Sequence, residues 1–129
     1  MHANIIDIRK FYEPFNSGNT DIYDEILADD WINYPNDPGH SADAAGFRNG
    51  ILDFRDSFKN FKLTIIQIIQ DDRNIAIHLQ MNGIQVKQFA GIPPRFESVT
   101  FYGLDRHLLT EDLSKIQNTW HFEDFSSLL

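Results

Sequence analysis

The chain has 129 residues, no cysteine and a formal net charge of −8. A chain of this length is expected to form a single domain, 1–129, that buries a core without disulfides or a structural metal. The negative charge disfavours nucleic acids and anionic membranes as partners. No segment has the apolar run of a signal peptide or a membrane span, so a cytoplasmic protein is expected.

The first part of the sequence is predicted to be helical. Apolar residues recur at helical spacing within 5–15, and Pro14 is expected to kink or end that helix. A second helix is predicted after the NSGN turn at 16–19. The segment 28–40 contains two prolines and a glycine near its end and is predicted to be a break in regular structure.

A third helix is predicted after this break, with Ser41 as a possible cap. Phe47, Ile51, Phe54 and Phe58 recur along one of its faces. Two glycines within it are expected to weaken the helix locally.

Near residue 61 the hydrophobic period changes from that of a helix to that of a strand. The segments 61–70, 75–82, 98–109 and 115–125 are rich in β-formers or alternate apolar and polar residues. Helices first and a meander of long strands second predict an α+β domain, in which about three N-terminal helices cover one face of a curved, mainly antiparallel sheet.

The last two predicted strands carry the candidate chemistry. If the TEDLS turn is centred near Ser114, His107 lies opposite or nearly opposite His121, and Asp105 shares their face. With Glu123 on the same face, two imidazoles and two carboxylates provide the mixed electrostatic environment that acid/base catalysis near neutral pH needs. Asp105 is expected to favour the charged form of His107. This would leave His121 the better base, with the two titrations coupled.

A simpler interpretation competes with this one. Polar residues at alternate positions of an antiparallel strand usually face water. A slip of one residue in the pairing would also send His107 and His121 to opposite faces.

Several ordered segments resemble the SnoaL-like polyketide cyclase family over nearly the whole chain. The resemblance implies a cone-shaped α+β barrel, shared with ketosteroid isomerases, that encloses one deep apolar pocket. It also implies ring closure of an aromatic polyketide ester without cofactor or metal, and a homodimer formed through the outer face of the sheet. The segments are FYEPFNSGNTDIYDEILADDWINYP, AGFRNGILDFRDSF, AGIPP, GLDRH and KIQNTWHFEDF.

The resemblance also implies roles for individual residues. His107 matches a histidine of the family's catalytic pair, and His121 occupies the position of its catalytic aspartate. The family's carboxylate is therefore replaced by an imidazole, and Asp105 or Asp124 is left to supply a carboxylate, with Asp105 the better placed.

Three functional hypotheses follow. The chain is a cofactor-free acid/base enzyme acting on an apolar carbonyl compound, a binding protein for a small apolar molecule, or an orphan domain whose cone is filled by its own phenylalanines. No histidine pair has helical metal-ligand spacing, so no metal is expected. The candidate substrate-binding residues are Phe15, Trp31, Phe47, Ile51, Phe54 and Phe101.

Overall fold

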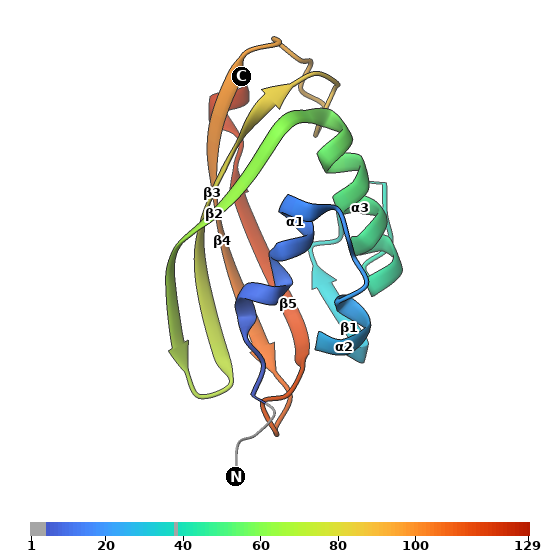
Figure 1. Cartoon of the computed structure of the whole chain (residues 1–129), viewed down its shortest axis with the longest axis vertical. Coiled ribbons are helices and arrows are strands. Elements are labelled where there is room, and N and C mark those ends of the chain that lie inside the picture. The colour runs from blue at the N-terminus through green and yellow to red at the C-terminus, as the bar shows by residue number, and fades with distance from the viewer. Residues whose placement is uncertain (1–4, 38) are drawn as a thin grey trace.

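The computed structural model describes residues 5–37 and 39–129. Helices cover one face of a single bent sheet (Figure 1). In chain order the helices are the 3-10 helix η1 (Ile8–Phe11), α1 (Glu13–Ser17), α2 (Tyr23–Ile26), α3 (Ala44–Ser57) and the 3-10 helix η2 (Ser126–Leu128).

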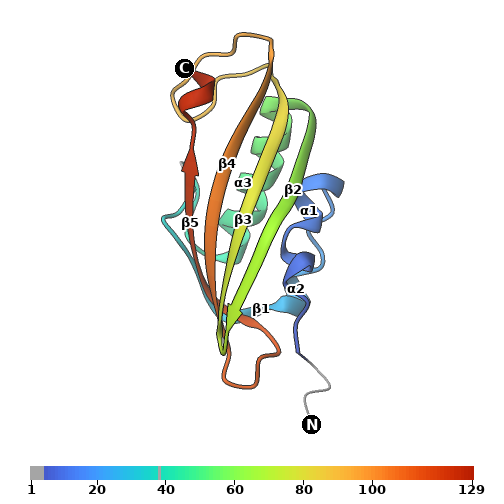
Figure 2. The ribbon, with the colours of Figure 1, turned by 90° about the vertical axis from the view of Figure 1, so that its left-hand side faces the viewer.

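The sheet has five strands in the order β1-β5-β4-β3-β2. The pair β1–β5 is parallel and the other three pairs are antiparallel. The sheet is open, and its long strands curve around α3 (Figure 2). These features confirm the predicted α+β class, with three α-helices on a curved, mainly antiparallel sheet. The strands are β1 (Leu27–Tyr34), β2 (Phe58–Asp71), β3 (Asn74–Gln85), β4 (Ser98–Leu109) and β5 (Ile116–Asp124).

Strand β1 was not expected, because the sequence predicts a break over 28–40. The strand ends at Tyr34, directly before the first proline of that segment. Its pairing with β5, for example Asn33 with Thr119, joins segments far apart in the sequence. Leu27–Tyr34 lacks clean alternation, so its strand conformation depends on this long-range pairing.

The first residues of α1 and α3 explain where these two helices begin. Pro14 lies in the first turn of α1, where a missing N–H costs no intrahelical hydrogen bond, so the helix begins rather than ends there. The Asp43 side chain accepts a hydrogen bond from the Gly46 N–H and caps α3, whereas the Ser41 hydroxyl donates to Asp43. The predicted cap is therefore displaced by two residues.

The inward faces of the strands build the core. The predicted alternation of β3 is confirmed, with Ile75, Ile77, Leu79 and Met81 buried. On β4 the same alternation also buries two titratable residues, Asp105 and His107. A buried charge or imidazole is rarely tolerated without partners, so this stretch of β4 is the natural place to look for a functional site.

Candidate active site

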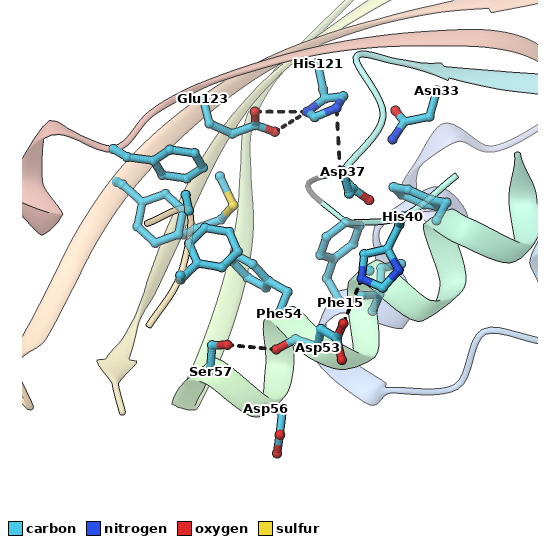
Figure 3. A pocket seen from close by; sticks show the side chains of 18 of the residues that line it. Phe15, Asn33, Asp37, His40, Asp53, Phe54, Asp56, Ser57, His121 and Glu123 are labelled. Atoms are coloured by element: carbon cyan, nitrogen blue, oxygen red, sulfur yellow. Dashed lines mark hydrogen bonds and ion pairs between the residues drawn. The ribbon is translucent and has the colours of Figure 1, made fainter. Parts of the chain in front are cut away.

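A cavity of about 410 Å³ lies between the sheet and α3. Its walls combine many aromatic rings with ionisable side chains, of which Asp37, His121 and Glu123 lie near β5 and the loop after β1 and His40, Asp53 and Asp56 lie by α3 (Figure 3). The phenylalanines at the wall are Phe11, Phe15, Phe47, Phe54, Phe89, Phe101 and Phe125. The cavity is of a size that suits a small organic ligand.

Most of the predicted substrate-binding residues reach this wall, and Trp31 does not. Phe15, Phe47, Ile51, Phe54 and Phe101 line the cavity. The Trp31 side chain is only 1% exposed and lies behind the wall.

Trp31 is held there by a polar contact. Its indole N–H donates to the Thr119 hydroxyl oxygen at 3.0 Å, and its ring packs edge-on against Phe47. A buried indole needs a hydrogen-bond partner, and the partner sits inside the core. Trp31 is therefore not among the residues that line this cavity.

The pairing of β4 with β5 differs from the expected register by two residues. Asp105 is opposite His121, and His107 is opposite Thr119. The pairing also shifts between Leu108 and Leu109, at the end of the hairpin next to the turn. Because the displacement is even, every side chain stays on its predicted face. The faces were predicted correctly, and the cross-strand partners were not.

His107 is fully buried and does not line the cavity. Its Nε2 lies 2.7 Å from the Tyr12 hydroxyl oxygen, and its Nδ1 lies 2.8 Å from the Thr119 hydroxyl oxygen. Burial lowers the pKa of His107 to about 3. The imidazole is therefore neutral at physiological pH and has no direct access to a ligand.

Asp105 is also buried, but it borders the cavity. Its Oδ2 accepts a hydrogen bond from the Tyr12 hydroxyl at 2.7 Å, and its Oδ1 has no hydrogen-bond partner among the described residues. Burial raises the pKa of Asp105 to about 7, although the Tyr12 hydrogen bond acts against this shift. A carboxyl group with this pKa can exchange a proton near neutral pH.

His121 borders the cavity and has acceptors at both ring nitrogens. Its Nδ1 lies 2.7 Å from Glu123 Oε1, and its Nε2 contacts the Pro35 carbonyl oxygen and lies 3.8 Å from Asp37 Oδ1. Burial disfavours its charge, but the Glu123 carboxylate, the Pro35 carbonyl and Asp37 outweigh burial and raise the pKa of His121 to about 9. His121 is therefore an imidazolium at neutral pH.

These environments reverse the expected division of roles. His121 was expected to be the neutral base and His107 the charged partner. Instead burial keeps His107 neutral, and the carboxylates around His121 keep it protonated. Asp105 does not contact His107 directly, because the Tyr12 hydroxyl lies between them.

The loop after β1 brings a second carboxylate to the cavity. A Cβ on Gly50 of α3 would lie 2.5 Å from Asp37 Oδ2, so the missing side chain at this position lets the loop approach the helix. Burial raises the pKa of Asp37. The nearby Asn33 side chain, 1% exposed, also lines the cavity, and neither its amide nitrogen nor its amide oxygen has a hydrogen-bond partner within residues 5–37 and 39–129.

The opposite rim is formed by α3 and the segment 87–90. The Lys87 ammonium pairs with Asp56, and His40 Nε2 lies 2.7 Å from Asp53 Oδ2. Phe89 packs edge-on against Phe54 at a ring separation of 5.0 Å. The segment 87–90, whose last residue is the first of AGIPP, therefore reaches the cavity.

Three important residues were not singled out by the sequence. Tyr12 was interpreted as part of a helical apolar stripe, and Asn33 and Asp37 fell within the predicted break. The contact between Tyr12 and Asp105 spans 93 residues, so no local pattern could reveal it. The one available signal was that Tyr12 brings a polar hydroxyl group into an otherwise apolar stripe.

Across residues 5–37 and 39–129, no group of three or more His, Asp or Glu side chains is arranged to hold a metal ion. None of the helices in these ranges is long and apolar enough to cross a membrane.

Solved structures with the same fold support the architecture. TsrD of Streptomyces laurentii has a TM-score of 0.81 at 20% identity, covering 94% of this chain and 87% of its own. IdmH of Streptomyces antibioticus has a TM-score of 0.77 at 22% identity, covering 94% and 91%. A SnoaL-like polyketide cyclase of Agrobacterium tumefaciens has a TM-score of 0.76 at 16% identity, covering 95% and 92%.

Fold and site together define a small α+β pocket protein, with helices over the concave face of a bent sheet. The chain belongs to the SnoaL-like polyketide cyclase family, whose model matches residues 6–129. The resemblance noted in the sequence and the cone-shaped fold it implied are confirmed. A comparison with curated proteins finds no significant match.

Proposed function

We propose that the protein catalyses a proton-transfer reaction on a neutral apolar carbonyl compound, of the intramolecular aldol type, with Asp105 as the base. One observation carries this proposal. Asp105 borders an aromatic cavity, one of its buried carboxylate oxygens has no hydrogen-bond partner among the described residues, and its pKa is about 7. Family membership supports the reaction class.

The proposed steps balance without any external reagent. Asp105 Oδ1 takes a proton from a carbon next to a substrate carbonyl, and the C–H electron pair forms an enolate. The enolate carbon attacks a second carbonyl of the same molecule, which forms the new C–C bond and an alkoxide. The Asp105 carboxylic acid then returns the proton to the alkoxide, so the product is an isomer of the substrate.

His121 is proposed to act through its charge. An imidazolium at the cavity wall stabilises the negative oxygen of an enolate, and its effect is strengthened by the low dielectric of the cavity. The Asn33 amide, which has no partner in the described part of the chain, supplies a hydrogen-bond donor on the same wall. The family's acid/base pair is thus replaced by Asp105 as base and His121 as cation.

The walls indicate which substrates fit. Seven phenylalanines favour a flat apolar molecule. Several carboxylates border the cavity and oppose the entry of anions, so a neutral compound is preferred to a phosphorylated or carboxylated one. These carboxylates are Asp37, Asp53, Asp56, Asp105 and Glu123.

The test measures deuterium uptake from D₂O by NMR. The probes are neutral aryl ketones whose side chain carries a second ketone, so that internal aldol ring closure is possible. The wild type is expected to accelerate exchange at the carbon next to the ketone, and Asp105→Asn to lose about 10²–10⁴-fold of that acceleration. Asp124→Asn is the matched control, because Asp124 is exposed at the end of β5 outside the cavity. Equal exchange by the wild type and Asp105→Asn would overturn the proposal.

A binding protein without turnover is the second candidate. It is favoured by the fact that both ring nitrogens of His121 already have acceptors within the chain. A ketone that raises the melting temperature of the wild type, with no exchange above the buffer rate, would support this candidate and exclude the first.

A further inference from the structure

Five side chains form a continuous path of hydrogen bonds from the core to the cavity. We name this path the Trp31–Asp105 chain. Four of its members come from the neighbouring strands β1, β5 and β4, and Tyr12 is contributed by the segment between η1 and α1. All five side chains are buried, so water does not substitute for a missing partner. The members are Trp31, Thr119, His107, Tyr12 and Asp105.

The direction of the path is fixed at its tryptophan end. An indole N–H can donate and cannot accept, so the Thr119 oxygen is the acceptor at the 3.0 Å contact with Trp31. The Thr119 hydroxyl proton then remains, and its other contact in the described chain is His107 Nδ1 at 2.8 Å. For the buried hydroxyl to be paired, Nδ1 must accept.

The direction continues through the imidazole. A neutral imidazole whose Nδ1 accepts carries its proton on Nε2. This Nε2–H donates to the Tyr12 oxygen at 2.7 Å, and the Tyr12 hydroxyl donates to Asp105 Oδ2 at 2.7 Å. Each donor has one acceptor, and every hydrogen bond of the path is satisfied.

We propose that the Trp31–Asp105 chain runs in this one direction. In this arrangement Trp31 and Thr119 set the tautomer of His107, and Tyr12 holds one oxygen of Asp105 so that the other faces the substrate. His107 is thereby a positioning residue and not a proton acceptor. This inference goes beyond the proposed function, and its bearing on catalysis rests on Asp105 being the base.

The reverse direction is less favourable for a specific reason. It needs a proton on Asp105 Oδ2 and a proton on His107 Nδ1. Thr119 would then accept from both Trp31 and His107, and its own buried hydroxyl proton would have no partner. A proton taken from a substrate by Oδ1 leaves the path unchanged, because Oδ2 continues to accept from Tyr12.

The charged groups around Asp105 do not alter this direction. His121 and Glu123 on β5 and Asp37 after β1 influence the carboxyl through their charges. Burial and Asp105 raise the pKa of Tyr12 well above its usual value, so the hydroxyl keeps its proton.

The first test is ¹⁵N NMR of histidine-labelled protein, which distinguishes the two ring nitrogens. His107 is expected to show a protonated Nε2 and an unprotonated Nδ1 throughout pH 5–8. Trp31→Phe removes the fixed donor, and signals of both tautomers are expected. Trp120→Phe is the matched control, since Trp120 lies outside the path against Arg106 and Tyr34. A protonated Nδ1 in the wild type would overturn the proposal.

The second test measures the pKa of Asp105 by ¹³C NMR of its carboxyl carbon. Tyr12→Phe removes the donor to Oδ2, and the pKa of Asp105 is expected to rise by about one pH unit. An unchanged pKa would show that Tyr12 does not support the carboxylate. Neither measurement needs a substrate. The proposed direction of the hydrogen bonds can therefore be disproved while the proposed function stands, and the proposed function can be disproved while the direction stands.

Discussion

His107 on β4 and His121 on β5 project from the same face of one hairpin into different surroundings. Around His107 the neighbours are hydroxyl groups and aromatic rings, and the side chain is fully buried. Around His121 the neighbours are two carboxylates and a carbonyl oxygen at the rim of a cavity. The same residue type is therefore neutral in one region and a cation in the other, and the neighbours decide its chemistry.

The largest expected difference between the two regions is in stability. His107→Ala leaves a cavity and deprives both Tyr12 and Thr119 of a partner, so the free energy of unfolding at pH 7 should fall by roughly 3–5 kcal/mol. His121→Ala should cost roughly 1–2 kcal/mol, because water can reach the rim. Urea unfolding measures both.

The exposed His78 of β3 provides the control, and His78→Ala should change stability by about 0.5 kcal/mol or less. If His107→Ala and His121→Ala lowered the free energy of unfolding by similar amounts, the proposed difference between the buried network and the open rim would be contradicted.

The next largest expected effect is the pH dependence of stability that the Asp105 carboxyl group causes. The pKa of Asp105 is about 7 in the folded protein, compared with 3.8 for the ordinary group. Between these values the folded state binds the proton and the unfolded state does not, so stability falls as pH rises from about 4 to 7. Asp105→Asn removes this dependence.

The stability advantage of Asp105→Asn over the wild type should therefore grow by up to roughly 4 kcal/mol between pH 4 and pH 7. Urea unfolding of both proteins at several pH values gives the two slopes. Parallel curves would mean that Asp105 ionises as an exposed aspartate does.

A titration of the unaltered protein sharpens the comparison without a mutation. The pKa of His107 is lowered to about 3 and that of His121 is raised to about 9. NMR should show no titration of His107 between pH 5 and 8, and His121 should lose its proton only near pH 9. The stability that His121 contributes is fully present below about pH 6.5 and is lost as pH rises toward 9.

Two midpoints near 6.5 would show that both imidazoles are exposed. A single pair of coupled midpoints would instead support the interaction first expected between the two histidines.

The smallest expected change in stability comes from substitutions on the outer face of the β4–β5 hairpin, opposite the face that carries the two histidines. Leu104 and Phe122 are paired across β4 and β5 and are 53% and 64% exposed, and Ile69 of β2 is also exposed. An apolar face of this kind needs covering. We propose that a second copy of the chain covers it.

The double variant Leu104→Lys/Phe122→Lys should then be monomeric at micromolar concentration by light scattering, whereas the wild type is expected to be a dimer. The stability of the folded chain should change by about 0.5 kcal/mol or less per site. Leu52→Lys on the outer side of α3 is the control for added charge, and it should leave the dimer intact. A monomeric wild type would contradict the proposal.

Much of the fold follows from local patterns. The change from helical to strand period near residue 61 separates the helices from the long strands, and it is confirmed by the start of β2 at Phe58. Strand alternation also placed Asp105, His107 and His121 on one face, because side chains alternate strictly along a strand. These properties depend on neighbours in the sequence.

Tertiary structure decided what these residues do. Strand β1 exists because it pairs with β5, and the exact partners across the β4–β5 hairpin depend on a shift of register near the turn. Tyr12 reaches Asp105 and His107 across more than 90 residues of sequence. Burial and these long-range partners set the charges, because the free energy of ionisation depends on what surrounds a group in space and not on its place in the chain.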